Sequence, residues 1–264
     1  TKMYLLGRGS DIITEWDLST AWDIRTAALS YLFELSSYET SPWGFFFRKD
    51  GLKFYVVGST GDDVNEFTMS SAWDLSSATF TNVSTQKVQT DAYGVEFDSD
   101  GSYCWITTNS DIIHGYPLST AWDITSMGAD NKTLNVATGD TTPRKVRFSP
   151  DGTKFYLTGT STDDVSVYSL STPWDISSGG ASADSTSEEI LGDARYESFH
   201  VDDSNGEYLY AMDYRNSNVV RYKTTTPGVF KVSTLDRTGL QRFSTFAQTA
   251  TAGSMLNLST DGTI

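Results

Sequence analysis

Short apolar runs separated by polar turns recur along the whole chain. Phe45–Phe47, Val95–Phe97 and Val146–Phe148 are each followed, three to four residues later, by an Asp-Gly pair and a further apolar run. Asp-Gly between two such runs is typical of a β-hairpin, because the turn needs residues that tolerate positive φ. The pattern therefore predicts paired antiparallel strands rather than helices.

Each hairpin is followed by two more predicted strands. The second strands are expected at Lys53–Val57, Ser102–Thr107 and Lys154–Thr158, and the third strands at Val64–Met69, Ile112–Leu118 and Val165–Leu170. A Ser-Thr-x-Trp-Asp loop, or a close variant of it, leads from the third strand into a fourth, less regular one. The unit thus predicted is a four-stranded antiparallel sheet.

This unit repeats along the chain. The Trp-Asp pairs begin at Trp22, Trp73, Trp122 and Trp174, and a degenerate further copy runs over residues 201–230. Self-similarity at a fixed period of about 50 residues indicates a propeller or another repeat architecture. Five units of about 53 residues account for the whole chain, so we expect one domain over residues 1–264.

The two ends of the chain match complementary parts of one repeat. Residues 256–263 match Val146–Thr153, and residues 1–4 match Thr153–Tyr156. The C-terminus would therefore supply the first strand that the N-terminal unit lacks, which removes exposed sheet edges. The fold class predicted is all-β: a closed five-bladed β-propeller whose first blade is completed by the C-terminal strand.

Composition excludes several classes of partner. The formal net charge is −15, with aromatic residues at 13% and charged residues at 20%. Such a charge repels phosphate backbones and anionic membrane surfaces, so no nucleic acid partner is expected. The sequence contains no run of 18 apolar residues, so insertion into a membrane is not expected. Cys104 is the only cysteine, which excludes an intramolecular disulfide, and its apolar neighbours predict a buried strand position.

The recurring residues are interpreted as structural. The Trp of each Trp-Asp pair is expected to pack between adjacent sheets, and the Asp to cap the following turn. Repeated sugar-stacking pockets are the alternative, although the fifth copy has Gly228-Val229 at this position. Acidic turns such as Asp62-Asp63 and Asp98–Gly101 coincide with hairpins and lack the full ligand pattern of a calcium loop. No metal or cofactor site is predicted.

Positions that differ between the copies are free for function. The loop entering the first strand carries Trp43, Tyr93, Arg144, Glu197 beside Tyr196, and Ser254. The middle of the first strand carries Phe46, Glu96, Arg147, His200 and Asn257. The first set is expected on one face near the axis, and the second around the channel. A mixture of aromatic, charged and amide side chains suits a polar ligand such as a glycan. The candidate ligand-binding residues are Trp43, Tyr93, Glu96, Arg144, Arg147, Tyr196, Glu197 and His200.

Signals of catalysis are few. No nucleophile elbow, phosphate-binding glycine loop or metal-spaced histidine pair is present. His200 near Glu96 and Arg147 could form an acid–base site, and Glu96 with Glu197 is the one plausible carboxylate pair for glycoside hydrolysis. Nothing in the sequence marks these residues as catalytic. A protein without enzymatic activity is therefore expected.

The repeat itself resembles a known group. The segment DGTKFYLTGTSTDDVSVYSLSTPWDIS, with its sister copies, resembles a propeller-like repeat of tail-fibre and structural proteins of marine bacteriophages and of some bacterial surface proteins. It is also similar to WD-repeat propellers in having Trp-Asp pairs, but the His partner of that repeat is absent. The final residues, from Gly239 onward, are similar to linker sequences of phage fibres, which competes with their role as a closing strand.

The resemblance implies a location and a role. A virion surface or another extracellular location is expected, with a host surface glycan or protein as the ligand, and with homo-oligomers if the chain belongs to a fibre. The alternatives are a propeller hydrolase acting on a polysaccharide or lactone, and a purely architectural protein that contacts other virion proteins. The resemblance carries over no catalytic residue, because the matching positions are structural.

Overall fold

The computed structural model describes residues 1–89, 91–161, 165–186, 196–201, 208–213, 218–226, 229–235, 241–242 and 254–259. In this part the chain is all-β and forms antiparallel, mostly four-stranded sheets that resemble propeller blades. The only helices described are four single 3₁₀ turns, η1 (Ile24–Thr26), η2 (Leu75–Ser77), η3 (Ile124–Ser126) and η4 (Ile176–Ser178). No helix among these residues is long and apolar enough to cross a membrane.

The strands follow the predicted repeat. In chain order they are β1 (Lys2–Gly7), β2 (Ile12–Leu18), β3 (Ala27–Glu34), β4 (Pro42–Phe47), β5 (Lys53–Gly58), β6 (Val64–Met69), β7 (Ala78–Val83), β8 (Ala92–Phe97), β9 (Tyr103–Thr108), β10 (Ile112–Pro117), β11 (Lys132–Asn135), β12 (Pro143–Phe148), β13 (Lys154–Gly159), β14 (Val165–Ser169), β15 (Ser185–Thr186), β16 (Tyr196–Val201), β17 (Tyr208–Asp213), β18 (Asn218–Thr226), β19 (Val229–Leu235), β20 (Gln241–Arg242) and β21 (Ser254–Ser259).

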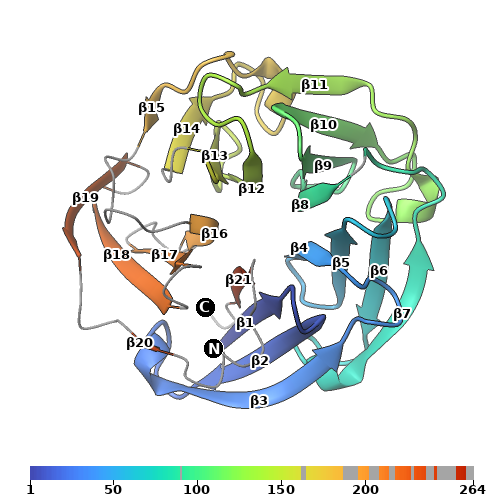
Figure 1. The fold of residues 1–264 in the computed structure, drawn as a ribbon, viewed down its shortest axis with the longest axis vertical. Coiled ribbons are helices and arrows are strands. Elements are labelled where there is room, and N and C mark those ends of the chain that lie inside the picture. Colours follow the sequence, from blue (N-terminus) through green and yellow to red (C-terminus); the bar gives the residue numbers. More distant parts are fainter. Residues whose placement is uncertain are drawn as a thin grey trace.

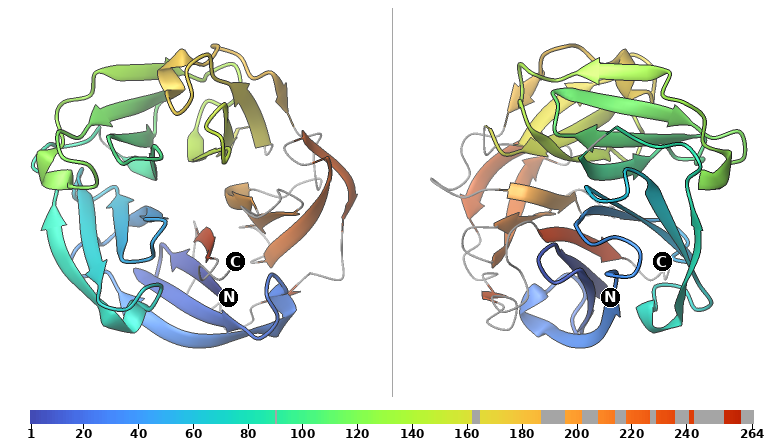
Figure 2. Two further views of the ribbon diagram at one scale, coloured as in Figure 1. Left: turned by 180° about the vertical axis from the view of Figure 1, so that it is seen from behind. Right: turned by 45° about the vertical axis from the view of Figure 1, so that its right-hand side comes forward.

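The described strands form sheets in the orders β21-β1-β2-β3, β4-β5-β6-β7, β8 to β11, β12 to β15, and β16 to β19 with β20 paired to β18. Figure 1 shows these sheets set around a common centre, with β21, β4, β8, β12 and β16 innermost. The views of Figure 2 show the same arrangement from behind and turned by 45°. The start of each innermost strand therefore lies near one end of the central axis.

Burial falls from the innermost strand to the outermost one. All six residues of β8 are buried, whereas most residues of β3 and β7 are exposed. The apolar core lies between neighbouring sheets rather than inside a single one. One cluster joins Tyr55 and Val57 to Val95 and Phe97 across two sheets. Cys104 is buried in the same cluster, as its neighbours predicted.

The strand nearest the C-terminus pairs with the strand nearest the N-terminus. β21 runs antiparallel to β1, from the pair Lys2–Ser259 to the pair Gly7–Ser254. β21 thus completes the sheet of β1, β2 and β3. A second link lies between that sheet and the sheet of β16 to β19, where Met3 and Leu5 pack with Tyr210 and Met212.

The Trp-Asp corners have the predicted structural role. Trp22, Trp73, Trp122 and Trp174 all adopt positive φ, between 63° and 66°, which is unusual for a bulky residue. The backbone N–H of Trp122 donates to the carbonyl of Gly101, and the Trp122 ring stacks on Phe97, with centroids 5.3 Å apart. The following Asp123 caps η3 by accepting from the Thr125 N–H. Packing by the Trp and capping by the Asp are both confirmed.

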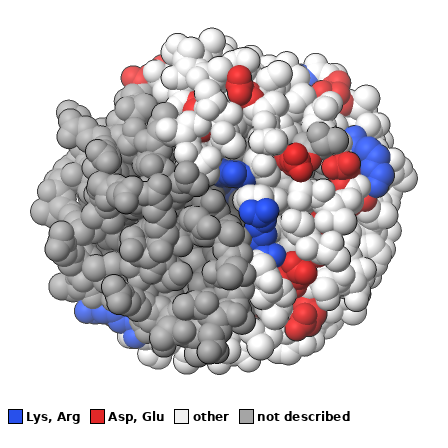
Figure 3. Space-filling model, in the orientation of Figure 1, with Lys and Arg blue, Asp and Glu red and all other residues white. Residues whose placement is uncertain are grey.

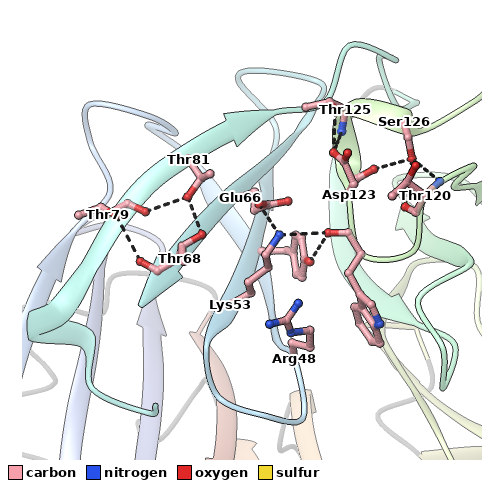
Figure 4. A network of polar contacts seen from close by, with 12 residues as sticks. Arg48, Lys53, Glu66, Thr68, Thr79, Thr81, Thr120, Asp123, Thr125 and Ser126 are labelled. Carbon is pink, nitrogen blue, oxygen red and sulfur yellow. Dashed lines mark hydrogen bonds and ion pairs between the residues drawn. The ribbon is translucent and has the colours of Figure 1, made fainter. Parts of the chain in front are cut away.

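Hydrogen bonds tie three of the four corners to the neighbouring sheet. Tyr55 on β5 donates from its hydroxyl to the carbonyl oxygen of Trp122, at 2.8 Å. Figure 4 shows this corner, where Lys53 reaches both Glu66 and the same carbonyl. Tyr4 makes the equivalent bond to Trp73, and Tyr210 makes it to Trp22. The bond therefore recurs between successive sheets.

Replacing Tyr55 by Phe tests the strength of this link. Burial, together with the Glu66 charge, raises the pKa of Tyr55, so its hydroxyl stays protonated and donates over the whole working pH range. Tyr55→Phe is expected to lower the free energy of unfolding by about 1–2 kcal/mol, because the partly buried carbonyl of Trp122 loses its shorter hydrogen bond and keeps only Lys53 at 3.5 Å. Urea denaturation measures this loss of stability, and Tyr31→Phe, at an exposed position, is the control. Equal stability of both variants would show that the bond contributes nothing.

Candidate functional site

The loop positions predicted to vary for function are β-bulges in the structure. The register between the first and second strands shifts between Pro42 and Gly44, and it shifts at the equivalent places of β8, β12 and β16. The residues left without a partner across the sheet are Trp43, Tyr93, Arg144 and Glu197. A bulge can re-aim the extra side chain out of the regular alternation of its strand.

Three of these side chains meet. The guanidinium of Arg144 lies 3.7 Å from the centroid of the Tyr93 ring and 4.4 Å from that of Trp43. The two rings lie 4.5 Å apart, tilted by 58°. Arg8, from the β1–β2 hairpin, lies 3.5 Å from the Trp43 centroid. We call Arg8, Trp43, Tyr93 and Arg144 the axial cluster.

Close backbone packing allows the axial cluster to form. A Cβ atom on Gly94 would lie 2.2 Å from the carbonyl oxygen of Arg144, so only glycine fits there. The same carbonyl accepts a hydrogen bond from the Thr107 hydroxyl at 2.7 Å, which fixes the β12 backbone against β9. Because neighbouring first strands approach this closely, the side chains that follow each other around the axis come into contact.

Several donors of the axial cluster lack acceptors. Nε and Nη1 of Arg144 and Nε1 of Trp43 are buried and have no hydrogen-bond partner. Within the described part of the chain, Arg144 takes part in no salt bridge. The buried loop carboxylates are engaged elsewhere: Glu39 accepts from the backbone of Ser41, and Asp140 from that of Thr142. An unsatisfied cation beside two rings is an unusual arrangement in a protein of net charge −15.

Lys145 is a central residue that the sequence analysis missed. Its side chain is buried, and its ammonium lies 3.2 Å from the Val95 carbonyl oxygen and 3.5 Å from that of Phe45. The ammonium also lies 3.5 Å from the Glu96 carboxylate. Burial lowers the pKa of Lys145, and the charge of Glu96 opposes that shift. Lys145 stands where the other copies have Gly44 and Gly94, a contrast that could have identified it.

The residues in the middle of the first strands have a different environment from the one predicted. Phe46 packs into the core between two sheets and stacks on Trp122, with centroids 6.2 Å apart. His200 is buried and stacks in the same way on Trp22, at 6.1 Å. The prediction that these positions line a channel is therefore wrong for Phe46 and His200, which fill the layers between sheets. Glu96 is also buried, whereas Arg147 is half-buried.

The other candidates are only partly described. Tyr196 and Glu197 lie at the start of β16, and Ser254 and Asn257 lie in β21, but their side chains are outside the described part of the chain. Among the described residues, no three His, Cys, Asp or Glu side chains are grouped so that they could hold a metal ion. The acidic turn at Asp100 is confirmed as turn chemistry, since its carboxylate accepts from the Ser102 N–H.

A groove of about 560 Å³ lies on the outer side, away from the axis. It runs between β3 and β7, and its exposed rings are Tyr31, Tyr38 and Phe80. Tyr38 and Phe80 stack on each other at 4.7 Å. The groove offers apolar faces and one acidic side chain, Glu34, but no cationic donor. Its chemistry thus differs from that of the axial cluster. On the face drawn in Figure 3, basic side chains lie both near the middle and at the edge, and acidic ones are spread among them over the described part.

Comparison with known proteins supports the fold alone. No protein-family model and no curated protein matches the chain. A protein from Lactobacillus plantarum aligns with a TM-score of 0.51 at 15% identity, over 88% of this chain and 67% of that one. A candidate 6-phosphogluconolactonase from Bacteroides uniformis aligns with a TM-score of 0.49 at 14% identity, over 84% and 64% of the two chains.

A chain of the mitotic checkpoint complex gives a TM-score of 0.46 at 16% identity, over 83% of this chain and 57% of that one. This chain thus spans at most 67% of the length of these three structures. The first similarity agrees with blade-like four-stranded sheets. None of the three is described as a phage protein, so the phage resemblance depends on the repeat sequence.

Proposed function

We propose that residues 1–264 form one closed five-bladed β-propeller, completed by β21, that acts as a binding module without enzymatic activity. Closure is supported by the pairing of β21 with β1 and by the Tyr210–Trp22 hydrogen bond between the last and first sheets. A closed ring also leaves no unpaired blade face at the two ends. The ligand-binding face is the end of the axis that carries the axial cluster.

One observation carries the binding proposal: the recurrent bulge at the start of the first strand. The repeat is maintained where the sheets pack, but the bulged position holds Trp43, Tyr93 or Arg144 in successive copies. A position that is structurally constant and chemically varied suits recognition, because the scaffold stays fixed while the contacts differ. The contacts available there are donors and aromatic edges, which suit the hydroxyl and acidic groups of a glycan.

The repeat resemblance supports a location on a phage virion or fibre, or on another extracellular surface. The ligand would then be a glycan or protein of the host surface, and a fibre setting would favour homo-oligomers. A purely architectural role among virion proteins is the competing possibility. A hydrolase acting on a polysaccharide or lactone is less well supported, because Glu96, one of its two carboxylates, is buried beside Lys145.

Binding by the axial cluster predicts a specific loss in two variants. Trp43→Ala and Tyr93→Ala should each weaken glycan binding about tenfold or more, because aromatic residues at the centre of a site contribute most of its energy. A glycan array, followed by calorimetry with the best ligand, measures the loss. A parallel screen for cleaved glycan tests the hydrolase alternative.

Tyr31→Ser is the matched control, since it removes an exposed ring from the outer groove instead. If Tyr31→Ser abolishes binding and Trp43→Ala does not, the groove is the site and the axial proposal is wrong. Finding no glycan ligand, while the chain is ordered inside assembled virions, would favour the architectural role. Thermal melts of all three variants confirm that the loss reflects binding rather than unfolding.

A further inference from the structure

We infer that the axial cluster selects a ligand that carries a carboxylate, so that the glycan it binds is an acidic oligosaccharide. The inference builds on the proposed function and specifies its ligand class. Three features of the described residues carry it: the covered ring faces, the unsatisfied donors of Arg144, and the lack of a compensating acidic side chain.

The ring faces are already occupied. Arg144 lies over Tyr93 at 3.7 Å and over Trp43 at 4.4 Å, and Arg8 lies over Trp43 at 3.5 Å. A neutral sugar that recognised the site by stacking would have to displace a guanidinium from a favourable cation–π contact. What the axial cluster presents to a ligand is therefore positive charge held in place by rings, rather than open aromatic faces.

The donors of Arg144 point to an anion. A guanidinium carries five N–H groups, and two of the three nitrogens of Arg144 are buried without an acceptor. Buried donors left unpaired are costly. Nε and Nη1 lie on different edges of the guanidinium, so a carboxylate would accept two parallel N–H bonds from one of them together with Nη2. The residue as a whole is half-buried, so part of it is open to solvent, where an acidic ligand would approach it. The Trp43 indole supplies a further unpaired N–H nearby.

Among the residues that the structure describes, no carboxylate forms a salt bridge with Arg144. The two buried carboxylates of the neighbouring loops, Glu39 and Asp140, both accept from backbone N–H groups. The buried Glu96 lies beside the ammonium of Lys145. A carboxylated ligand would supply the missing counter-charge, while the overall charge of −15 disfavours anions elsewhere on the surface.

Matched pairs of oligosaccharides test the inference. The full chain is titrated with carboxylated oligosaccharides, such as oligogalacturonates, and with the carboxyl-reduced form of each one. We expect the carboxylated member to bind about 10- to 100-fold more tightly, as a hydrogen-bonded charge pair allows, and to lose this advantage as salt rises. Arg144→Gln should lower the affinity for the carboxylated oligosaccharide to the affinity for its carboxyl-reduced form. Arg48→Gln, which removes an Arg paired with Asp50 at the other end of β4, should change neither affinity.

Each other result has a defined meaning. Equal affinity for the two members, with Trp43→Ala still weakening both, would overturn the acidic ligand class and leave the proposed function standing. A preference for the carboxylated member that survives Arg144→Gln would place the recognition elsewhere and overturn the inference. If no carboxylated or neutral oligosaccharide binds on the array, the inference fails together with the glycan form of the proposed function, and a protein of the host surface remains as the ligand class.

Discussion

A chain lacking residues 254–264 is expected to lose most of its stability. β21 pairs with β1 along the whole length of that strand, from Lys2 to Gly7. Four residues of β1, Met3 to Leu6, are fully buried. Removing β21 leaves the backbone groups of β1 unpaired and exposes apolar surface on both of its faces. The loss should reach about 5 kcal/mol or more, which is comparable to the total stability of a typical domain.

Thermal and urea melts followed by circular dichroism measure this loss. The control is a chain that lacks only residues 260–264, which follow the last residue of β21 and should melt close to the full chain. Adding a synthetic peptide of residues 254–264 to the truncated chain should restore part of the lost stability, because the strand can pair from outside. An unchanged melting temperature after the long truncation would instead favour a linker role for the last residues.

The repeat made the strands predictable. The third strand expected at Val64–Met69 is β6 with the same bounds, and the others differ by a few residues at their ends. The agreement arises because two independent signals coincide in each copy, the Asp-Gly turn and the apolar run. The fourth strands were the least certain, and they differ most in length, from eight residues in β3 to two in β15. Their exposed positions carry little apolar pattern, so the sequence constrains them weakly.

The candidate site was only partly predictable. Comparing the copies identified Trp43, Tyr93 and Arg144 as equivalent positions, and the structure brings these three together. The comparison could not find Arg8, which occupies a different place in the repeat and reaches Trp43 from a hairpin of the neighbouring sheet. Nor could it show that guanidinium groups cover the rings, because side-chain stacking depends on the distance between sheets.

Phe46 shows why the channel prediction was wrong. In a β-strand, alternate side chains point to opposite faces of the sheet, and each face of a blade packs against a neighbouring blade. The middle residues of the first strands therefore point into the layers between sheets, as Phe46 does toward Trp122. The residue that reaches the neighbouring first strands comes from another position: the ammonium of the buried Lys145 contacts the carbonyl oxygens of Phe45 and Val95. Strand position alone did not reveal which face would approach the axis.

The second large effect is expected at Gly101, in the turn beneath the corner tryptophan Trp122. Gly101 has φ of 74°, and a Cβ atom there would lie 2.3 Å from the Trp122 ring. Gly101→Ala would strain the backbone and push the indole away from Phe97. We expect a loss of about 3–5 kcal/mol, similar to truncation of the ring itself. Gly128→Ala is the matched control, because its nearest neighbour lies at an ordinary 3.4 Å.

A double-mutant cycle separates the two causes of that loss. If the clash with the indole dominates, Gly101→Ala should cost only about 1–2 kcal/mol in a Trp122→Ala background, where the backbone strain alone remains. The coupling measured by urea denaturation should then be about 2 kcal/mol or more. Additive costs would mean that the ring and the turn act independently, and the conclusion that the corner tryptophan packs on its own hairpin would be wrong. Equal losses for Gly101→Ala and Gly128→Ala would contradict it as well.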